Sequence, residues 1–408
     1  MASMLKLLLY RLKRPYHYIK TGLLKGLPAE YKHHFPSKKL TVIAITGTDG
    51  KTTSSTMLYH VLKQAGFKVA LLTTVAAYLG DEEIDTGFHV TSPQPDDLQR
   101  FMRMMVDKGF THLVLEVTSH GVYQYRTWGV NPDFAGLTNI TREHLDYHIS
   151  YDEYLAAKTE LLSQAKKVVL NADDTSYYKV KRLLPLDTDV KSYSTSVSLS
   201  KKVTAAITER FQEKYNQMNA RLVYGLAQIL LVSDEDFATA IANFPGIPGR
   251  MEFVKTTRHF ELVVDFAHTP QGLESALTAL RGYMKKNKKK GRLISIYGCA
   301  GLRDSEKRPI MGEIGARLAD ITIFTAEDPR TEDVWTIIRQ MKEKLTQNHA
   351  KVMSIADRKE AIDFAVSKLA QPGDIIAVLG KGHEKSMCYG TTEYPWSDKE
   401  AILESLKK

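Results

Sequence analysis

Short apolar runs alternate with longer amphipathic stretches along the first part of this chain. The apolar runs cover residues 40–45, 69–72, 112–117, 134–137 and 167–170. Helical patterns lie between them, for example at 96–108 and 151–165. Continuous apolar strands separated by helices are typical of a parallel sheet that is covered by helices on both faces.

A second series of the same kind follows a turn-rich stretch, Pro245–Arg250, which has the composition of a linker. Its apolar runs cover 262–265, 293–297, 321–324 and 375–379. We therefore predict an α/β protein with a central domain at 40–245, built on a mostly parallel sheet. A smaller Rossmann-like α/β domain is predicted at 246–408.

Residues 1–39 form a basic arm with a different pattern. They contain nine Lys and Arg residues and one acidic residue, Glu30, a net charge of +8 out of +9 for the whole chain. Leucines and tyrosines alternate with these cations, which suits an amphipathic helix on an anionic membrane surface. The alternative is a basic helix packed on the body, or a frayed terminus. Because the remainder carries only +1, the charge does not indicate a nucleic-acid-binding enzyme.

The cysteine content and hydropathy restrict the class of protein. Cys299 and Cys388 are too few for a disulfide framework or a Cys-rich metal site. No apolar run approaches the roughly 20 residues that span a bilayer. The sequence thus indicates a cytoplasmic protein, with the inner face of the membrane as a peripheral location for the arm.

A glycine-rich loop between the first strand and a helix is the strongest chemical signal. It consists of Thr46, Gly47, Thr48, Asp49, Gly50, Lys51, Thr52 and Thr53. Backbone N–H groups and a helix N-terminus at such a loop hold phosphates. Lys51 can reach the outer phosphates and the Thr52 hydroxyl can hold Mg²⁺. Ile45 stands where the usual pattern has another glycine, so the motif is a shortened version.

Polar clusters follow several of the predicted strands, where open parallel sheets bind ligands. They are Glu116–His120, Thr138–His148, Asp265–Pro270, Gly298–Asp304 and Gly380–Glu384. Glu116 suits a Mg²⁺ ligand because Mg²⁺ prefers oxygen donors, whereas His144 could equally serve in hydrogen bonding. Together with Lys51, these groups could support phosphoryl transfer.

These clusters and three further segments, Tyr154–Lys158, Asn171–Asp174 and Gly249–Glu252, occur in one order from about residue 40 to 400. In that order they resemble the Mur ligase family, and within it the members that add the third residue of the peptide. The resemblance implies an ADP-forming acid–amino-acid ligase that uses ATP and Mg²⁺. The muropeptide carboxylate would form an acyl phosphate, which the amine of an amino acid then attacks. A monomer is expected.

The resemblance also implies roles for individual residues. The catalytic positions are Lys51, Glu116, His144, Lys158 and His268, and the metal-binding positions are Thr52, Glu116, His144 and Lys158. Lys158 matches a lysine that the family carbamylates. Nucleotide contacts beyond the glycine-rich loop match Asn216, Asn219, Arg250 and Asp265. The muropeptide site matches Thr91, Ser92, Thr118, Gln124 and Arg126. The pocket for the incoming amino acid matches Arg303, Glu327, Asp328, Arg330, Gly380 and Glu384.

Departures from the family pattern leave the substrates open. Arg330 favours meso-diaminopimelate through a bidentate pair with a carboxylate. Glu327-Asp328 stands where the family usually has Asp-Asn, and Ala300 and Leu302 replace a usual Gly and Asp, so lysine or another diamine is the alternative.

The N-terminal part of the chain departs further from the family pattern. The family's UDP-gripping domain has no counterpart in residues 1–39, which leaves a UDP-linked and a lipid-linked acceptor as alternatives. A ligase for another acid, such as a folate or a storage polymer, and a non-catalytic nucleotide-binding scaffold at the membrane are the remaining hypotheses.

Overall fold

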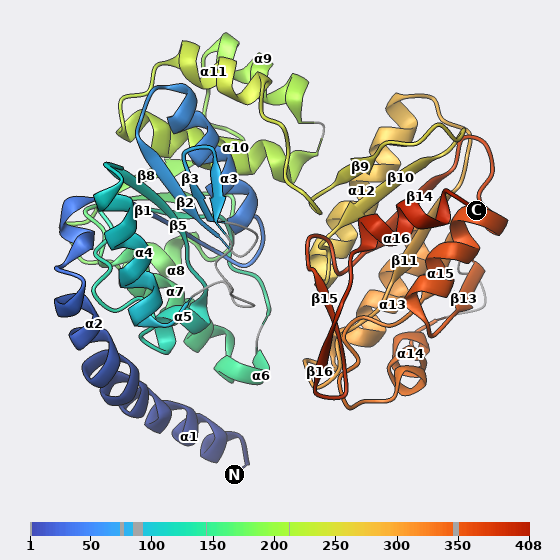
Figure 1. Cartoon of the computed structure of the whole chain (residues 1–408), viewed down its shortest axis with the longest axis horizontal. Helices are drawn as coiled ribbons and strands as arrows, with labels where there is room; N and C mark the ends of the chain where they lie inside the picture. Colours follow the sequence, from blue (N-terminus) through green and yellow to red (C-terminus); the bar gives the residue numbers. More distant parts are fainter. Residues whose placement is uncertain (1, 74–76, 85–92, 144, 212, 346–350) are drawn as a thin grey trace. The chain divides into compact units, whose positions relative to one another are not determined.

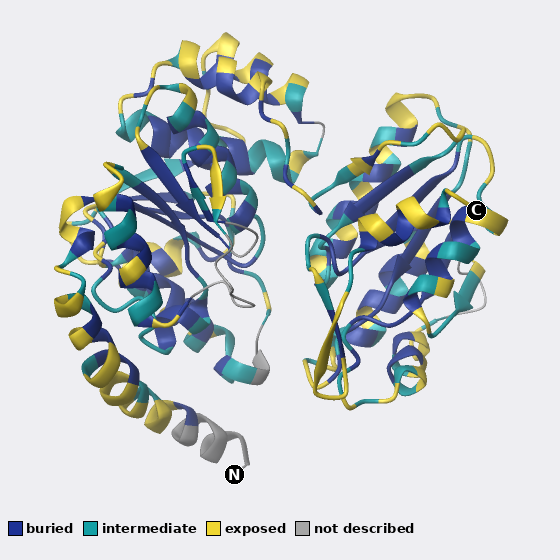
Figure 2. Ribbon diagram, in the orientation of Figure 1, coloured by how far each residue is buried: buried dark blue, intermediate teal, exposed yellow. Residues whose placement is uncertain are grey.

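The computed structural model of the chain describes residues 2–73, 77–84, 93–143, 145–211, 213–345 and 351–408. It divides into two compact units, Met1–Phe244 and Pro245–Lys408 (Figure 1). In each unit the strands form a buried centre and the exposed residues lie mainly on helices and loops (Figure 2).

An eight-stranded sheet forms the centre of the first unit, in the order β4-β3-β2-β5-β1-β6-β7-β8. Its parallel strands are β1 (Thr41–Thr46), β2 (Val69–Leu72), β5 (His112–Glu116), β6 (Phe134–Leu137), β7 (Lys167–Asn171) and β8 (Asp189–Tyr193). Two short strands, β3 (Ala77–Leu79) and β4 (Glu82–Ile84), run antiparallel at one edge. The predicted α/β fold with a mostly parallel sheet is confirmed.

Helices cover both faces of this sheet (Figure 1). Ala135 and Leu137 of β6 pack with Leu155 of α7, whereas the intervening Gly136 faces Leu222 of α10. The alternation follows from the two-residue period of a strand. The helices are α3 (Lys51–Gln64), α4 (Pro95–Asp107), α5 (Ser119–Tyr123), α6 (Leu145–His148), α7 (Tyr151–Leu162), α8 (Tyr177–Leu183), α9 (Lys201–Arg210), α10 (Lys214–Ile229) and α11 (Asp234–Ala242).

The second unit is built on a six-stranded sheet in the order β13-β12-β11-β14-β10-β9. Its strands are β9 (Glu252–Val254), β10 (Glu261–Asp265), β11 (Leu293–Tyr297), β12 (Ile321–Phe324), β13 (Lys351–Ser354) and β14 (Ile375–Leu379), of which only the edge strand β9 is antiparallel. Val263 packs with Leu277 on one face, and Val264 packs with Ile362 and Ile402 on the other. This is a second α/β layer structure with its own core.

The helices of the second unit are α12 (Pro270–Lys286), α13 (Lys307–Leu318), α14 (Val334–Lys342), α15 (Arg358–Phe364), the π-helical η3 (Ala365–Leu369) and α16 (Asp398–Ser405). A separate hairpin of β15 (Ser386–Tyr389) and β16 (Thr392–Pro395) follows the last strand of the sheet.

The basic arm is helical and packs against the first unit. It comprises α1 (Ala2–His17), the π-helical η1 (Tyr18–Gly26), α2 (Leu27–Lys32) and the short 3-10 helix η2 (Pro36–Lys39). A Cβ atom added to Gly22 or Gly26 would lie 2.5 Å from Trp128, so only glycine allows this close approach. The opposite side of the arm is largely exposed (Figure 2). Among the described residues no helix is both long and apolar enough to cross a membrane.

Candidate active site

The glycine-rich loop between β1 and α3 requires its two glycines. Gly50 has φ 80°, and Gly47 would place a Cβ atom 1.8 Å from Thr138 Oγ1. The Asp49 amide donates to Asn139 Oδ1 at 3.1 Å, and the Thr138 hydroxyl donates to the Asp49 carbonyl at 2.6 Å. The segment after β6 therefore fixes the loop, because β6 pairs with β1 in parallel.

Thr52 and Glu116 meet beside this loop. Thr52 lies in the first turn of α3, and Glu116 ends the neighbouring strand β5. The Thr52 hydroxyl donates to Glu116 Oε2 at 3.0 Å, and both residues are buried. Two oxygen donors next to a phosphate-binding loop fit a hard divalent cation such as Mg²⁺.

Lys158 is buried on α7 and reaches the same loop. Its Nζ donates to the Gly47 carbonyl at 2.5 Å and lies 4.5 Å from the centre of the Tyr154 ring. Burial, reinforced by the nearby charge of Lys51, holds the pKa of Lys158 well below its ordinary value. Lys51 itself folds over the loop, where its Nζ donates to the Thr48 carbonyl at 2.6 Å.

The other predicted nucleotide contacts of this unit lie at the start of α10. A Cβ atom on Gly50 would come within 2.4 Å of Asn219 Oδ1. Asn219 Nδ2 also donates to Asn216 Oδ1 at 3.3 Å. Thr46 is buried at the end of β1, and Thr53 is partly exposed in the first turn of α3.

Thr118, Gln124 and Arg126 surround the short helix α5. The Thr118 hydroxyl caps α5 by accepting from the Gly121 amide at 3.1 Å. Gln124 Nε2 donates to the Tyr147 hydroxyl at 2.7 Å, and burial lowers the pKa of Arg126. The remaining predicted residues of this unit, Thr91, Ser92 and His144, lie outside the described residues.

In the second unit, the predicted amino-acid pocket gathers at the ends of β12 and β14. Gly380 has φ 105°, and a Cβ atom there would lie 2.1 Å from Glu327 Oε2. Glu327 is 5% exposed, and its Oε2 has no hydrogen-bond partner among the described residues. Burial raises the pKa of Glu327 to about 7, opposed by the charges of Lys307, Arg358 and Lys381.

Lys381 lies between two of the predicted pocket carboxylates. Its Nζ donates to Asp328 Oδ1 at 2.8 Å and also pairs with Glu384. Although Glu384 pairs with this cation, burial raises its pKa. The buried ammonium of Lys381 therefore compensates the charge of Asp328.

Two arginines complete the predicted pocket. Arg330 Nη1 donates to the Gly301 carbonyl at 2.7 Å, which connects the loops after β12 and β11. Arg303 is exposed in the loop after β11. Because β12, β11 and β14 are neighbours in the sheet, all six predicted residues lie on loops at one edge.

Three further predicted residues, Arg250, Asp265 and His268, lie around Phe266, the residue that follows β10. The first two were predicted as nucleotide contacts and His268 as a catalytic position. Asp265 accepts from the amides of Met251 at 2.6 Å and Ala267 at 2.9 Å. The Arg250 guanidinium lies 4.4 Å from the centre of the Phe266 ring. The His268 ring also lies 4.4 Å from it.

The sequence alone did not single out several supporting residues. Asn139 holds the glycine-rich loop, and its place in the polar cluster after β6 was the available signal. The buried Arg358 donates to the carbonyls of Ala326 at 3.2 Å and Leu379 at 2.8 Å. It also forms a buried ion pair with Asp398. Arg358 thus fixes the ends of two strands, although nothing in its local sequence indicated this role.

Comparison with known families decides the identity. Residues 45–230 match the family described as the Mur ligase middle domain, and residues 249–382 match the Mur ligase, glutamate ligase domain. The chain belongs to the Mur ligase family.

Two curated relatives of this Mur ligase share one name. The protein named UDP-N-acetylmuramoyl-L-alanyl-D-glutamate–2,6-diaminopimelate ligase from Clostridium botulinum is 36% identical over 392 residues, which cover 91% of this chain and 79% of that protein. Its namesake from Bacteroides fragilis is also 36% identical over 392 residues, covering 90% of this chain and 78% of that protein.

Solved structures agree on the fold. A structure with the same ligase name superposes with a TM-score of 0.59 at 26% identity, covering 93% of this chain and 82% of that chain. A Mycobacterium tuberculosis folylpolyglutamate synthase superposes with a TM-score of 0.69, covering 93% and 96%, and at 15% identity it shows the fold alone. This Mur ligase is an ATP-dependent, ADP-forming amino-acid ligase of peptidoglycan precursor synthesis.

Proposed function

We propose that this Mur ligase joins a diamino acid, with meso-diaminopimelate as the favoured substrate, to the carboxylate of a muramoyl-dipeptide, using ATP and Mg²⁺. The convergence of Thr52, Glu116 and Lys158 on the glycine-rich loop supports this most directly. The names of the two curated relatives support the choice of substrates.

The glycine-rich loop and Lys51 would hold the triphosphate of ATP. Backbone N–H groups of the loop and the N-terminus of α3 would bind its oxygens, and Lys51 would offset its negative charge. Thr52 and Glu116 would hold Mg²⁺, which offsets phosphate charge when bound. The acceptor carboxylate then attacks the γ-phosphorus and ADP leaves. The amine of the amino acid attacks the acyl carbon, loses a proton and expels phosphate.

Lys158 would act as a carbamate. A neutral amine can add CO₂, forming an N–C bond and releasing one proton, and the depressed pKa of Lys158 favours the neutral form. The product is an anion beside Glu116, with oxygen donors suited to a second Mg²⁺. Burial thus prepares the lysine for the modification.

The pocket of the second unit would select the amino acid. Arg330 gives one N–H group to Gly301, and its planar fork has further donors for a substrate carboxylate. Asp328 would oppose a diacid if its charge were uncompensated. Lys381 pairs with both Asp328 and Glu384, so it offsets part of this negative charge and weakens the objection to diaminopimelate.

The direct test is phosphate release from ATP with a panel of amino acids, offered with UDP-linked and lipid-linked muramoyl-dipeptide. Turnover with diaminopimelate supports the proposal. Turnover with lysine alone would indicate that lysine, the alternative diamine, is the substrate. A lack of turnover with both acceptors contradicts the proposal. It favours a ligase for another acid substrate or a non-catalytic nucleotide-binding scaffold.

Arg330→Ala should lower kcat/KM for diaminopimelate by about a hundredfold. Arg339→Ala, at an exposed position on α14, is the matched control.

We also propose that the arm docks on anionic membranes. Its outer side carries Leu12, Ile19 and Leu24, which are 60%, 53% and 69% exposed. Exposed lysines at 13, 20 and 25 lie among them. Apolar side chains beside cations are the combination that binds an interface of anionic lipid.

Sedimentation with vesicles of phosphatidylglycerol and phosphatidylcholine tests this docking. Replacing Lys13, Lys20 and Lys25 with Gln should weaken binding by roughly a hundredfold, at about 1 kcal/mol per lysine. The same change at the exposed Lys285, Lys286 and Lys290 removes equal charge and should leave binding nearly intact. Equal loss in both triple variants would contradict docking through the arm.

A further inference from the structure

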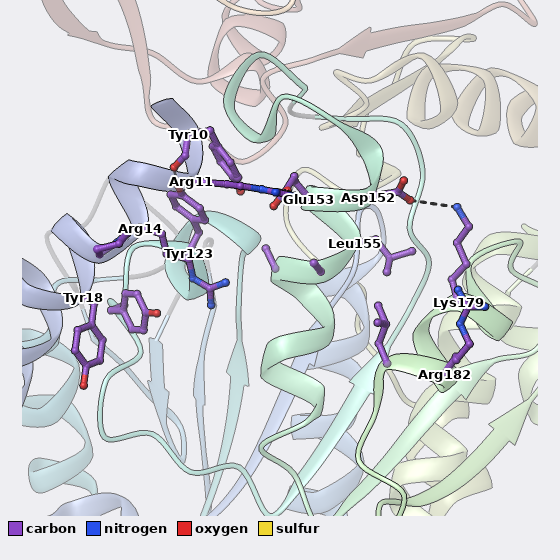
Figure 3. A pocket seen from close by; sticks show the side chains of 15 residues that line it. Tyr10, Arg11, Arg14, Tyr18, Tyr123, Asp152, Glu153, Leu155, Lys179 and Arg182 are labelled. Carbon is purple, nitrogen blue, oxygen red and sulfur yellow. Dashed lines mark hydrogen bonds and ion pairs between the residues drawn. The ribbon is translucent and has the colours of Figure 1, made fainter. Parts of the chain in front are cut away.

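The arm contributes a buried aromatic side chain, Tyr10, to the interior of the first unit. Tyr10 is 5% exposed, and its ring stacks on Tyr123 of α5 with 4.4 Å between ring centres. The Tyr123 hydroxyl donates to the Tyr10 carbonyl. Both tyrosines line a cavity of about 920 Å³ between the arm and helices α5, α7 and α8 (Figure 3).

The Tyr10 hydroxyl is hydrogen-bonded to a buried histidine. It lies 2.7 Å from Nδ1 of His148, the last residue of α6. The other ring nitrogen, Nε2, lies 2.9 Å from Ser119 Oγ. A single imidazole thus joins the arm to the first residue of α5.

These contacts end at α5, the helix that the proposed muropeptide residues Thr118 and Gln124 flank. Thr118 caps the N-terminus of α5, and Gln124 follows its last residue. Tyr147, the neighbour of His148, accepts the hydrogen bond from Gln124. The position of His148 therefore affects both ends of α5.

We propose that Tyr10 is a positioning residue, which orients α5 through His148 and Ser119 for acceptor binding. This inference rests on the proposed role of α5 in the muropeptide site. The arm then contributes to the acceptor site as well as to the molecular surface. Tyr10 contacts α5 and α6 directly, and it is connected to the glycine-rich loop through the packing of His148 on Tyr154, whose hydroxyl lies 3.1 Å from Thr48 Oγ1. The larger effect should therefore fall on the acceptor.

Tyr10→Phe tests this role, because it removes the hydroxyl and keeps the stacked ring. Amide hydrogen exchange in residues 119–124 should accelerate about tenfold, as expected when a buried hydrogen bond is lost. The KM for the acceptor should rise by about the same factor, while kcat and the KM for ATP should change much less. Tyr16→Phe, on the exposed side of the arm, is the matched control.

Ser119→Ala provides a second variant that leaves the arm unaltered. It breaks the hydrogen bond between Ser119 and Nε2 of His148 and should produce the same acceleration of exchange in α5. Wild-type exchange and acceptor KM in Tyr10→Phe would overturn the inference. Because exchange is measured without substrates, it still tests the positioning role if the wild-type enzyme proves to use a different acid.

Discussion

Two buried ionisable residues, Lys158 and Glu327, favour their uncharged forms in the two units. Burial lowers the pKa of Lys158, and it raises the pKa of Glu327 to about 7. Such shifts are common at functional sites, because burial that would only destabilise a structure can prepare a group for chemistry. Lys158 belongs to the proposed nucleotide site of the first unit, and Glu327 belongs to the proposed amino-acid pocket of the second.

We predict that Lys158→Ala lowers turnover by about a hundredfold or more, because it removes the anion proposed to lie beside Glu116. Short carboxylates such as acetate should restore part of the rate by occupying the vacated space. Turnover measured with and without added acetate checks this. Lys181→Ala, at an exposed position on α8, controls for general effects. Wild-type turnover in Lys158→Ala would show that no carbamate is needed.

Glu327 should make the free energy of unfolding depend on pH. Its pKa is 4.5 ordinarily and about 7 in the fold. Between these values the unfolded carboxyl ionises while the folded one keeps its proton, so stability falls as pH rises from 4.5 to 7.

Relative to wild type, Glu327→Gln should therefore be about 3 kcal/mol more stable at pH 8 than at pH 4. Denaturant unfolding at both pH values measures this difference. Glu343→Gln, at an exposed position, should show no comparable change. A pH-independent difference between Glu327→Gln and wild type would contradict the raised pKa.

At the scale of elements, the sequence predicted the central strands and missed the strands near the sheet edges. β1, β5, β10 and β14 are buried on both faces, so their apolar runs are continuous. In contrast, the edge strands β4, β8, β9 and β13 contain exposed or partly exposed residues. A strand at an edge has a neighbouring strand on one side only, so more of its residues meet solvent, and its short polar sequence resembles a loop.

The candidate site likewise contains features that the sequence could predict and contacts that it could not. The glycine-rich loop and Glu116 could be predicted because their chemistry depends on local spacing. The pairing of Lys381 with Asp328, and of Tyr10 with His148, joins residues far apart in the chain. Local sequence contains no information on such contacts, so only the fold could supply them.

The arm's packing gives an element-scale prediction. Gly26→Ala should destabilise the docked arm by about 1–3 kcal/mol, because the new methyl group overlaps Trp128. Gly282→Ala, within α12 and facing open space, should instead stabilise the protein by about 0.5–1 kcal/mol. Limited proteolysis of the arm and denaturant unfolding measure whether Gly26→Ala is destabilised and Gly282→Ala is stabilised. Equal effects of both variants would contradict the close packing on Trp128.

At the scale of the whole molecule, the net positive charge and the hydrophobic cores lie in different parts of the chain. Residues 1–39 carry +8 of the net charge of +9, whereas each unit has its own hydrophobic core. The charge of the arm fits its proposed docking on anionic lipid, and the units are suited to separate folding.

We predict that residues 245–408 fold as an isolated fragment, because the core of this unit is formed by its own helices and sheet. The fragment should unfold cooperatively on heating and give well-dispersed amide resonances. Unfolding without a cooperative transition would show that the second unit depends on the first.

The transfer of an oxygen atom tests the central claim most directly. The acceptor muramoyl-dipeptide, labelled with ¹⁸O in its reacting carboxylate, is incubated with ATP, Mg²⁺ and diaminopimelate. Because the carboxylate oxygen attacks phosphorus and its bond to carbon then breaks, the released phosphate should contain one ¹⁸O for each amide formed. Amide formation with unlabelled phosphate, or phosphate release without amide formation, would contradict the proposed function.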